Sequence, residues 1–363
     1  MRTKRIAIAL SGGVDSSVAA ALLQEQGYEV EGVTLRLHDG FPIDAAIAAA
    51  EALGIPHHIV DLREEFERLV IAAYAGEYAE GRTPNPCITC NREIKFGLLW
   101  EWARDHDFDM LATGHYARIG ETTSGDPIRL LRGVDPQKDQ SYFMYRIARE
   151  RLRRVLFPLG DLHKSAVKEM AATRGLPAAT AKESTGTCFV DALGHDVVVK
   201  RYHPHAYEPG DIVNEDGAVL GQHRGVAHYT VGQRKGIGIG GLEEPYYVSG
   251  IDAVQNRVIV GVVHDSEQSI FVCHDIVVDE QAWGEAHARI SMGAEMNAEI
   301  SRSGFLELDV VLRYHMEPIP AFVEVNADDT LTIALLRPAI GVSAGQSAVC
   351  YFRDMVVAGG IIT

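Results

Sequence analysis

The residues with the clearest chemical potential are seven near the start of the chain, Ser11-Gly12-Gly13-Val14-Asp15-Ser16-Ser17. They follow a short apolar run and open a segment with helical periodicity. The two glycines tolerate positive φ and let the backbone approach a ligand closely. Backbone N–H groups at a helix start, with the helix dipole, favour an anion there. Because the loop lacks Gly-Lys-Ser/Thr, it is not a Walker A loop, and it predicts a pyrophosphate held by backbone amides.

Three cysteines lie in polar sequence and could act as nucleophiles or sulfur carriers. Cys87 and Cys90 form a Cys-x-x-Cys pair, and Cys188 lies in a glycine-containing loop that follows a predicted helix. We expect Cys90 to stand just before a helix, where the helix N-terminus, Arg92 and Lys95 would lower its pKa.

The competing interpretation of Cys87 and Cys90 is half of a structural zinc site. Zinc normally takes four ligands, and no second Cys-x-x-Cys or His-x₃-His stands nearby. The redox or nucleophile interpretation is therefore preferred. Cys273 and Cys350 lie in apolar runs, and we interpret both as small buried hydrophobic residues.

Composition narrows the class of protein. The 363 residues carry 34 basic and 50 acidic side chains, a net charge of −16, with 47% apolar and 23% charged residues. These values are typical of a globular protein and exclude disordered and collagen-like chains. The apolar stretch Ile6–Leu10 is shorter than the about 7–15 residues of a signal peptide. Five cysteines without an export signal predict a reducing compartment, so we expect a cytoplasmic protein without membrane association.

The elements that must position these residues alternate in the first third of the chain. Strand-like runs at 5–10, 31–37, 58–62 and 110–113 are interleaved with helical runs at 14–26, 45–53, 64–78 and 94–106. This alternation predicts βαβ units and a parallel sheet.

The remainder of the chain has a different pattern. Residues 146–185 are predicted to be helical, with a division at Pro158 and Gly160. Beyond about residue 205, turn signals at 215–217, 255–256, 326–329 and 353–354 predict antiparallel hairpins. We therefore expect an α/β N-terminal domain with a parallel sheet (1–200), a small central β domain (201–270) and a C-terminal β-barrel-like domain (271–363).

Several strings, in this order, resemble one family, the tRNA-specific 2-thiouridylases (tRNA-uridine 2-sulfurtransferases), within the PP-loop ATP pyrophosphatases. They are residues 11–17, Gly-Arg-Thr-Pro-Asn-Pro-x-x-x-Cys-Asn (81–91), Ile-Lys-Phe-Gly (94–97), Ala-Thr-Gly-His-Tyr-Ala (112–117), Lys-Asp-Gln-Ser-Tyr-Phe (138–143), Ser-Thr-Gly-x-Cys-Phe (184–189), His-Tyr-Thr-Val-Gly-Gln-Arg-Lys-Gly (228–236), Arg-Tyr (313–314) and Gly-Gln-Ser-Ala-Val (345–349). Many enzymes would share the phosphate loop alone. The whole series, which spans nearly the entire chain, is specific to this family.

The resemblance implies a reaction. ATP would adenylate O2 of the wobble uridine of a tRNA, and a persulfide would deliver sulfur to C2 as AMP leaves. Cys188 would carry the persulfide, and Cys90 would be the partner thiol, a nucleophile able to form a disulfide with it. The implied cofactors are ATP and Mg²⁺, the implied partners are tRNA and a persulfide sulfur-donor protein, and we expect a monomer.

The resemblance also assigns binding residues. The ATP site would be lined by Ala9, Leu10, Ser11, Gly12, Gly13, Val14, Asp15, Ser16, Leu35 and Gly114. The target base would be approached by Asn85, Pro86 and Cys87. Other tRNA contacts would be made by His115, Lys138, Asp139, Gln140, Arg313, Tyr314 and Gln346.

This chain departs from the family pattern at Cys87, where many members have an aspartate proposed as an acid/base group. The segment after Leu37 is also shorter than in many members and lacks their cysteines. If loops bring Cys87, Cys90 and Cys188 together, three thiolates could hold a [4Fe–4S] cluster whose open iron binds sulfide. The cluster account and the persulfide account both stay open.

A tRNA partner requires local positive surface on this acidic chain. Residues 146–168 provide Arg146, Arg149, Arg151, Arg153, Arg154, Lys164 and Lys168. We predict a tRNA-binding face here, extended by Arg224, Arg234 and Lys235, and the alternative is a solvated helix face. The glycine-rich stretch 236–241 has no strand-then-helix context, so we expect a loop and not a dinucleotide site.

Two other functions remain as alternatives. An amidating PP-loop synthetase acting on a small molecule would not need the paired cysteines or the C-terminal β domain. A non-catalytic tRNA-binding homologue would not need Asp15, Cys90 and Cys188.

Overall fold

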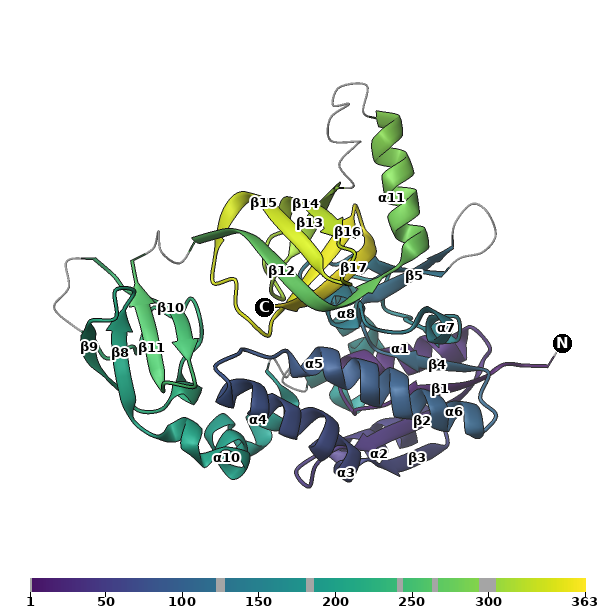
Figure 1. Ribbon diagram of the computed structural model, residues 1–363. Helices are drawn as coiled ribbons and strands as arrows, with labels where there is room; N and C mark the ends of the chain where they lie inside the picture. Colours follow the sequence, from purple (N-terminus) through teal and green to yellow (C-terminus); the bar gives the residue numbers. More distant parts are fainter. Residues whose placement is uncertain (1, 122–127, 181–185, 240–243, 263–266, 294–304) are drawn as a thin grey trace. The chain divides into compact units, whose positions relative to one another are not determined.

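The computed structural model describes residues 2–121, 128–180, 186–239, 244–262, 267–293 and 305–363 (Figure 1). They form two compact units that interleave along the chain. The first holds Met1–Val70, Cys87–Ala192 and Asp354–Val356, and the second holds Ile71–Pro86, Leu193–Arg353 and Val357–Thr363. Residues 184–185 of the sixth family string and residues 240–241 of the glycine-rich stretch lie outside the described part of the chain.

The first unit is built on a parallel sheet of strand order β3-β2-β1-β4-β7. Its strands are β1 (Arg5–Ala9), β2 (Glu29–Arg36), β3 (His57–Asp61), β4 (Met110–Thr113) and β7 (Val155–Leu156). The four strands expected from sequence are confirmed within two residues at either end. The two-residue β7 falls where a helical stretch was predicted, so that part of the prediction is wrong.

Helices α1 (Val14–Glu25) and α8 (Lys164–Thr173) pack together over the central strands. Ile6 and Ile8 of β1 are fully buried and share one core cluster with side chains of α1 and α8. Helix α2 (Ile43–Leu53) ends at Gly54, whose φ of +64° suits a left-handed cap. Burial of β1 is why its residues Ile6–Ile8 form a continuous apolar run.

Between β3 and β4 the chain is almost entirely helical. The predicted helix at 64–78 is α3 (Arg63–Phe66), a π-helical turn (η1, Glu67–Ile71) and α4 (Ala72–Ala79). The predicted helix at 94–106 corresponds to a longer helical segment. It consists of α5 (Pro86–Thr89), a π-helical stretch (η2, Cys90–Leu98) and α6 (Leu99–Asp105).

The rest of the first unit contains a hairpin, β5 (Ala117–Glu121) and β6 (Ile128–Arg132), followed by short helices. These are η3 (Ser141–Met144), α7 (Arg149–Leu152), η4 (Pro177–Thr180) and α9 (Cys188–Leu193).

The second unit holds a four-stranded sheet of order β10-β11-β8-β9. Its strands are β8 (Gly210–Asn214), β9 (Val219–His223), β10 (Tyr247–Asp252) and β11 (Arg257–Gly261). Short helices accompany the sheet: α10 (His195–Tyr202), η5 (Pro204–Tyr207) and η6 (Val226–His228).

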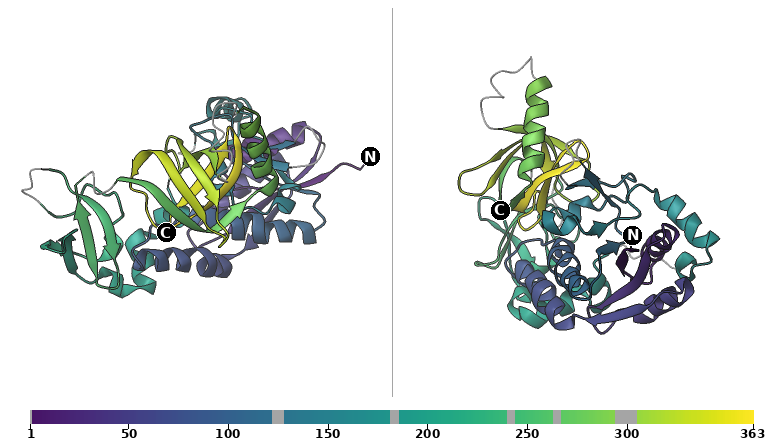
Figure 2. Two further views of the ribbon diagram at one scale, coloured as in Figure 1. Left: turned by 45° about the horizontal axis from the view of Figure 1, so that its top comes forward. Right: turned by 90° about the vertical axis from the view of Figure 1, so that its right-hand side faces the viewer.

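The second unit also contains a closed antiparallel barrel, seen from two further directions in Figure 2. Its strands are β12 (Glu267–Val278), β13 (Leu306–Val311), β14 (Ile319–Val325), β15 (Leu331–Ile340), β16 (Ser347–Phe352) and β17 (Met355–Ile362). Pairing of β12 with β17 closes the barrel. Cys273 and Cys350 are fully buried, as predicted. Helix α11 (Glu280–Gly293) was not predicted.

All four turn signals lie between neighbouring strands of the second half of the chain. Gly217, Asn256, Asp329 and Arg353 have φ of +83°, +53°, +57° and +59°. Glycine, asparagine and aspartate tolerate this left-handed backbone best, which is why three of these turns were visible in the sequence. The expected fold class, a parallel α/β domain followed by a small β domain and a β-barrel, is confirmed. In the described residues, no helix has the length and hydropathy needed to cross a membrane.

Candidate active site

The phosphate loop lies at the point where the strand order of the sheet reverses. Strand β2 lies on one side of β1 and β4 on the other, and Ala9 is in register with Thr113. Ligands of open α/β sheets bind outside the carboxyl ends of the strands at such a point. The loop that follows β1 and Gly114, which follows β4, therefore meet at the position where a nucleotide is expected.

Two glycines allow close backbone contact around this loop. Gly12 has a φ of +75°, and a Cβ there would overlap the backbone of Ala45 and Ala46 in α2. A Cβ on Gly114 would stand 2.7 Å from the nitrogen of Ser16. Any larger residue at either position would force the loop apart. Leu35, near the carboxyl end of β2, is buried beside this region of the sheet.

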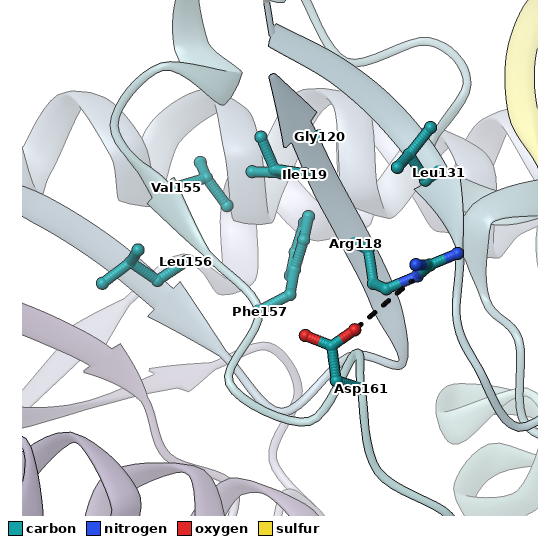
Figure 3. Close-up of a pocket in the computed structure, with 8 residues that line it drawn as sticks. All are labelled: Arg118, Ile119, Gly120, Leu131, Val155, Leu156, Phe157 and Asp161. Atoms are coloured by element: carbon teal, nitrogen blue, oxygen red, sulfur yellow. Dashed lines mark ion pairs between the residues drawn. The ribbon is translucent and has the colours of Figure 1, made fainter. Parts of the chain in front are cut away.

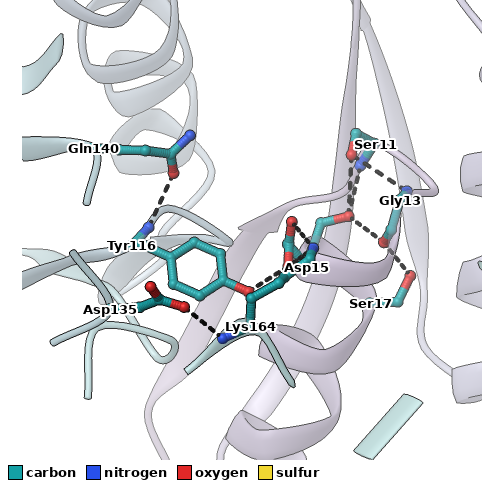
Figure 4. A network of polar contacts seen from close by, with 9 residues as sticks. Ser11, Gly13, Asp15, Ser17, Tyr116, Asp135, Gln140 and Lys164 are labelled. Carbon is teal, nitrogen blue, oxygen red and sulfur yellow. Dashed lines mark hydrogen bonds and ion pairs between the residues drawn. The ribbon is translucent and has the colours of Figure 1, made fainter. Parts of the chain in front are cut away.

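Serine hydroxyls brace the loop from inside (Figure 4). The Ser16 hydroxyl accepts a hydrogen bond from the Ser11 amide at 3.2 Å, and Ser16 Oγ lies 3.1 Å from Ser11 Oγ. The Ser17 hydroxyl is buried and donates to the Gly13 carbonyl at 2.9 Å. The Ser17 hydroxyl is therefore used inside the loop.

Asp15 is held by two residues from distant parts of the sequence (Figure 4). Lys164 Nζ lies 2.7 Å from both carboxylate oxygens, and the Tyr116 hydroxyl donates to Asp15 Oδ1 at 2.6 Å. Lys164 is only 7% exposed, and its backbone N–H donates to Asp135 Oδ2 at 2.9 Å. The loop lacks a Walker lysine, and Lys164 supplies an ammonium group at this position instead.

Sequence analysis missed this role of Lys164 and counted it with a basic surface, which is wrong. No local pattern marks the pair, because 149 residues separate Lys164 from Asp15. Arg151 is also engaged internally: it donates to the Phe96 carbonyl at 2.6 Å and pairs with Glu101 at 2.9 Å. Arg153, Arg154 and Lys168 are exposed as expected.

His115 lies beside the nucleotide region in a network of its own. Its Nδ1 lies 2.6 Å from Thr113 Oγ1, and its Nε2 lies 3.5 Å from Lys95 Nζ. Burial lowers the pKa of His115 well below its usual value, so the ring is neutral at neutral pH. Since the ammonium of Lys95 can only donate, Nε2 accepts and Nδ1 carries the proton toward Thr113.

Cys87, Cys90 and Cys188 lie close enough for the charge on Cys188 to raise the pKa of the other two thiols. Cys90 is buried and begins the π-helical stretch η2, a rare conformation that is frequent at functional sites. Cys188 is exposed at the first residue of α9, not in a loop as predicted. None of these three cysteines forms a disulfide.

The expectation of an activated Cys90 thiolate is wrong for this structure. Helix α5 precedes Cys90, so its thiol is not at a free helix N-terminus, and burial raises its pKa to about 12. Desolvation also raises the pKa of Cys87 and of Cys188. The positive charge of Lys95 acts in the opposite direction on all three thiols.

Residues expected to contact tRNA in the first unit organise a loop. The carboxylate of Asp139 accepts hydrogen bonds from the amides of Gly133 and Ser141 at 2.9 and 3.0 Å. The side-chain oxygen of Gln140 accepts from the Tyr116 amide at 3.0 Å. These bonds place Lys138 in the same loop, and they connect it to the tyrosine that holds Asp15.

The second unit carries the other residues expected to contact tRNA. Arg313 donates to the Gly341 carbonyl at 2.5 Å, and the ring of Tyr314 lies against that of His315. Gln346 Nε2 donates to the Thr83 carbonyl at 2.8 Å. Asn85 and Pro86 belong to this unit, whereas Cys87 belongs to the first.

A pocket of about 310 Å³ lies elsewhere in the first unit, between β5, β6 and β7 (Figure 3). Its walls include Leu131, Val155 and Phe157, and Arg118 and Asp161 form a 3.9 Å ion pair beside them. None of the described residues lining it is a cysteine, a histidine or part of the phosphate loop, so it is separate from the candidate site.

Family models match three consecutive parts of the chain. They are described as the tRNA methyl transferase HUP domain (residues 4–192), the tRNA methyl transferase PRC-barrel domain (196–262) and the aminomethyltransferase beta-barrel domain (288–362). A tRNA-specific 2-thiouridylase MnmA of Synechococcus sp. (strain JA-2-3B'a(2-13)) is 42% identical over 369 residues, 99% of this chain and 94% of its own length. The chain belongs to the tRNA-specific 2-thiouridylase family.

Another relative in the 2-thiouridylase family, from Pelobacter propionicus, is 41% identical and covers 99% of this chain and 97% of its own length. The expected membership among tRNA-uridine 2-sulfurtransferases is therefore confirmed. A solved structure described as a predicted subunit of tRNA methyltransferase from Methanocaldococcus jannaschii covers 47% of this chain and 74% of its own, with 18% identity and a TM-score of 0.33. It is too distant to add to the assignment.

Proposed function

We propose that this chain performs ATP-dependent 2-thiolation of the wobble uridine of tRNA. One observation carries the proposal: a phosphate loop at the strand-order reversal and the Cys87–Cys90–Cys188 cluster occur in one compact unit of a 2-thiouridylase family member. The first provides a site for activating an oxygen with ATP, and the second provides thiols for sulfur transfer.

In the first step, O2 of uridine attacks the α-phosphorus of ATP, and pyrophosphate leaves. Residues 9–16, Leu35 and Gly114 would bind the nucleotide, with backbone N–H groups directed at the phosphates. Lys164 would balance phosphate charge, and Tyr116 would orient Asp15. The carboxylate oxygens of Asp15 suit Mg²⁺, which prefers oxygen ligands and would neutralise phosphate charge when bound.

In the second step, the terminal sulfur of a Cys188 persulfide attacks C2, and the C2–O2 bond breaks as AMP leaves. The Cys90 sulfur then attacks the Cys188 sulfur as its proton passes to the departing thiolate, so 2-thiouridine is released and a Cys90–Cys188 disulfide remains for reduction. Exposure of Cys188 supports its loading by a separate persulfide donor protein. Burial of Cys90 supports its role as an internal partner thiol.

Contacts with tRNA would come from both units. Lys138, Asp139 and Gln140 in the first unit, and Arg313 and Tyr314 in the second, remain proposed contacts. Asn85, Pro86 and Cys87 remain the proposed approach to the target base. The hydrogen bonds of Asp139, Gln140 and Arg313 to the backbone suggest that these residues shape the binding surface as much as they touch the RNA.

The proposal is tested with purified protein, unmodified tRNA, ATP and a persulfide donor, by mass analysis of tRNA nucleosides. We expect 2-thiouridine from the wild type, none from Cys90→Ser or Cys188→Ser, and full activity from Cys350→Ala, whose thiol is buried in the barrel. Both cysteine variants should still release pyrophosphate when tRNA is present, because adenylation precedes sulfur transfer. Thiolation by either the Cys90 or the Cys188 variant would contradict the assigned roles.

The iron–sulfur account is tested by Cys87→Ser. Among the described residues, no group of three or more cysteines, histidines or carboxylates is arranged to hold a metal, so the cysteines as placed do not fit a cluster. We therefore expect protein purified without oxygen to contain no stoichiometric iron or sulfide, and Cys87→Ser to stay active. Bound iron that Cys87→Ser loses together with activity would instead favour the cluster.

A further inference from the structure

The segment that leads into the Asn85–Cys87 sequence is fixed by the barrel of the second unit. The Thr83 amide donates to the Ala344 carbonyl at 2.8 Å, and Gln346 Nε2 donates to the Thr83 carbonyl at 2.8 Å. Gly345 has a φ of +88°, and a Cβ on it would lie 3.0–3.2 Å from atoms of Arg82 and Thr83. Both backbone polar groups of Thr83 are thus used by one loop, 344–346.

That loop is itself tied to the last strand of the barrel. The Gly345 amide donates to the Ile362 carbonyl at 2.9 Å, and the Ile362 amide donates to the Gln346 carbonyl at 2.8 Å. The Gln346 amide also donates to the Ser343 carbonyl at 3.1 Å. The side chain of Gln346 therefore projects from a backbone that strand β17 holds on one side.

The residues just before Thr83 are held from other directions. Gly81 has a φ of +77°, and a Cβ there would stand 2.7 Å from a methyl carbon of Ile251 in β10. Arg82 pairs with Glu77 at 2.6 Å and with Glu80 at 2.5 Å. These contacts therefore restrict the backbone conformation of residues 81–83.

Two prolines follow Thr83 and restrict the backbone as far as Cys87. Pro84 and Pro86 each fix their own φ and restrict the residue before them to extended conformations. Only Asn85 lies between the two prolines, so little freedom remains between the anchored Thr83 and Cys87.

We infer that Gln346 is a positioning residue: its hydrogen bond to Thr83 sets where the Asn85–Cys87 segment presents itself to the target base. This inference rests on the proposed thiolation of a tRNA base. It differs from the role implied by family resemblance, in which Gln346 contacts the tRNA directly. A direct contact contributes to tRNA affinity, whereas a positioning residue contributes to the rate after binding.

The test combines three measurements on Gln346→Ala in the full-length protein. We expect amide hydrogen exchange in the peptide containing Thr83 to become about tenfold faster, because one anchoring hydrogen bond is lost. The Kd for tRNA should stay within about twofold of the wild type, and kcat for thiolation should fall about tenfold.

Two further variants are included, a second substitution of Gln346 and a control at another glutamine. Gln346→Glu retains the size of the side chain but presents an acceptor to the Thr83 carbonyl, so it should speed exchange as Gln346→Ala does. Gln222→Ala, at an exposed glutamine of β9 in the same unit, should leave exchange at Thr83 unchanged.

Unchanged exchange at Thr83, together with a clearly weakened Kd for tRNA, would overturn the inference in favour of direct contact. If the wild type made no 2-thiouridine, the proposed function would fail, whereas the exchange result would still report on the anchor. The two failures are therefore distinguishable.

Discussion

Lys164 and Asp15 form the most consequential pair of residues in the nucleotide region. Lys164 is nearly buried and Asp15 is about one-third exposed, so each neutralises the other in a partly desolvated place. In the proposed mechanism, the phosphates of ATP would become partners of Lys164 and a bound cation would become a partner of Asp15. The ion pair would then exchange partners when the nucleotide binds.

The ion pair between Lys164 and Asp15 can be tested with a double-mutant cycle. Asp15→Asn and Lys164→Met should each abolish tRNA-dependent AMP formation, because each removes a charge directed at the phosphates or the cation. Each should also lower the free energy of unfolding by about 1–3 kcal/mol, since one charge stays without its partner.

The double variant is the informative control for that cycle. It leaves no unpaired charge, so its thermal unfolding should return toward the wild-type temperature while AMP formation stays absent. Recovery of activity in the double variant would remove both residues from the nucleotide site.

The positive charge of Lys95 should affect the pKa of the Cys188 thiol and the pH dependence of its alkylation. The pKa of Cys188 is raised by desolvation, so less thiolate is present at a given pH, and the positive charge of Lys95 partly offsets this. In Lys95→Met the pKa should rise further. Alkylation of Cys188 by iodoacetamide at about pH 8 should therefore become several-fold slower, and its pH midpoint should move upward.

Lys168→Met provides the matched control, because Lys168 is an exposed lysine on α8. It should leave the alkylation profile unchanged, and Lys95→Arg should restore most of the wild-type profile. If Lys95→Met had the same pH profile of alkylation as the wild type, the charge of Lys95 would have no effect on the pKa of Cys188.

At the level of elements, the sequence predicted what local chemistry determines. The alternation of strand-like and helical runs located β1 to β4, most clearly β1, whose residues Ile6–Ile8 are fully buried and form a continuous apolar run. Turn residues located the hairpins of the second unit because positive φ selects glycine, asparagine and aspartate. The phosphate loop was visible because its glycines are demanded by contacts with α2 and by its own φ.

Other elements depend on contacts that no local pattern records. Strand β7 is two residues long and exists because it pairs with β4. The π-helical stretch at Cys90 has the composition of an ordinary helix, so its wider winding was not predictable. Lys164 looked like part of a basic surface because its partner, Asp15, lies 149 residues away. The parts that sequence analysis missed are therefore those fixed by distant contacts.

For the molecule as a whole, a net charge of −16 opposes binding of a polyanion. Local clusters must then provide the attraction, and of the basic stretch at 146–168 the exposed Arg153 and Arg154 are the best placed to do so. We predict that Arg153→Glu/Arg154→Glu weakens tRNA binding and lowers the slope of log Kd against log salt by about two.

Lys4→Glu, at an exposed residue near the chain start, controls for the reversal of a basic surface charge outside this stretch. It should leave the salt slope nearly unchanged. An unaltered slope in the double arginine variant would mean that these residues form only a solvated helix face.

The hydrogen bond between Gln346 and Thr83 has a consequence for synthesis of the chain on the ribosome. At about 5–20 residues per second, roughly 13–50 s pass between translation of Thr83 and of Gln346, which are 263 residues apart. During that time the phosphate loop and all three cysteines are made, but Thr83 lacks its hydrogen bond from Gln346. If Gln346 positions the Asn85–Cys87 segment as inferred, a nascent or prematurely terminated chain would contain the thiols before that segment is positioned.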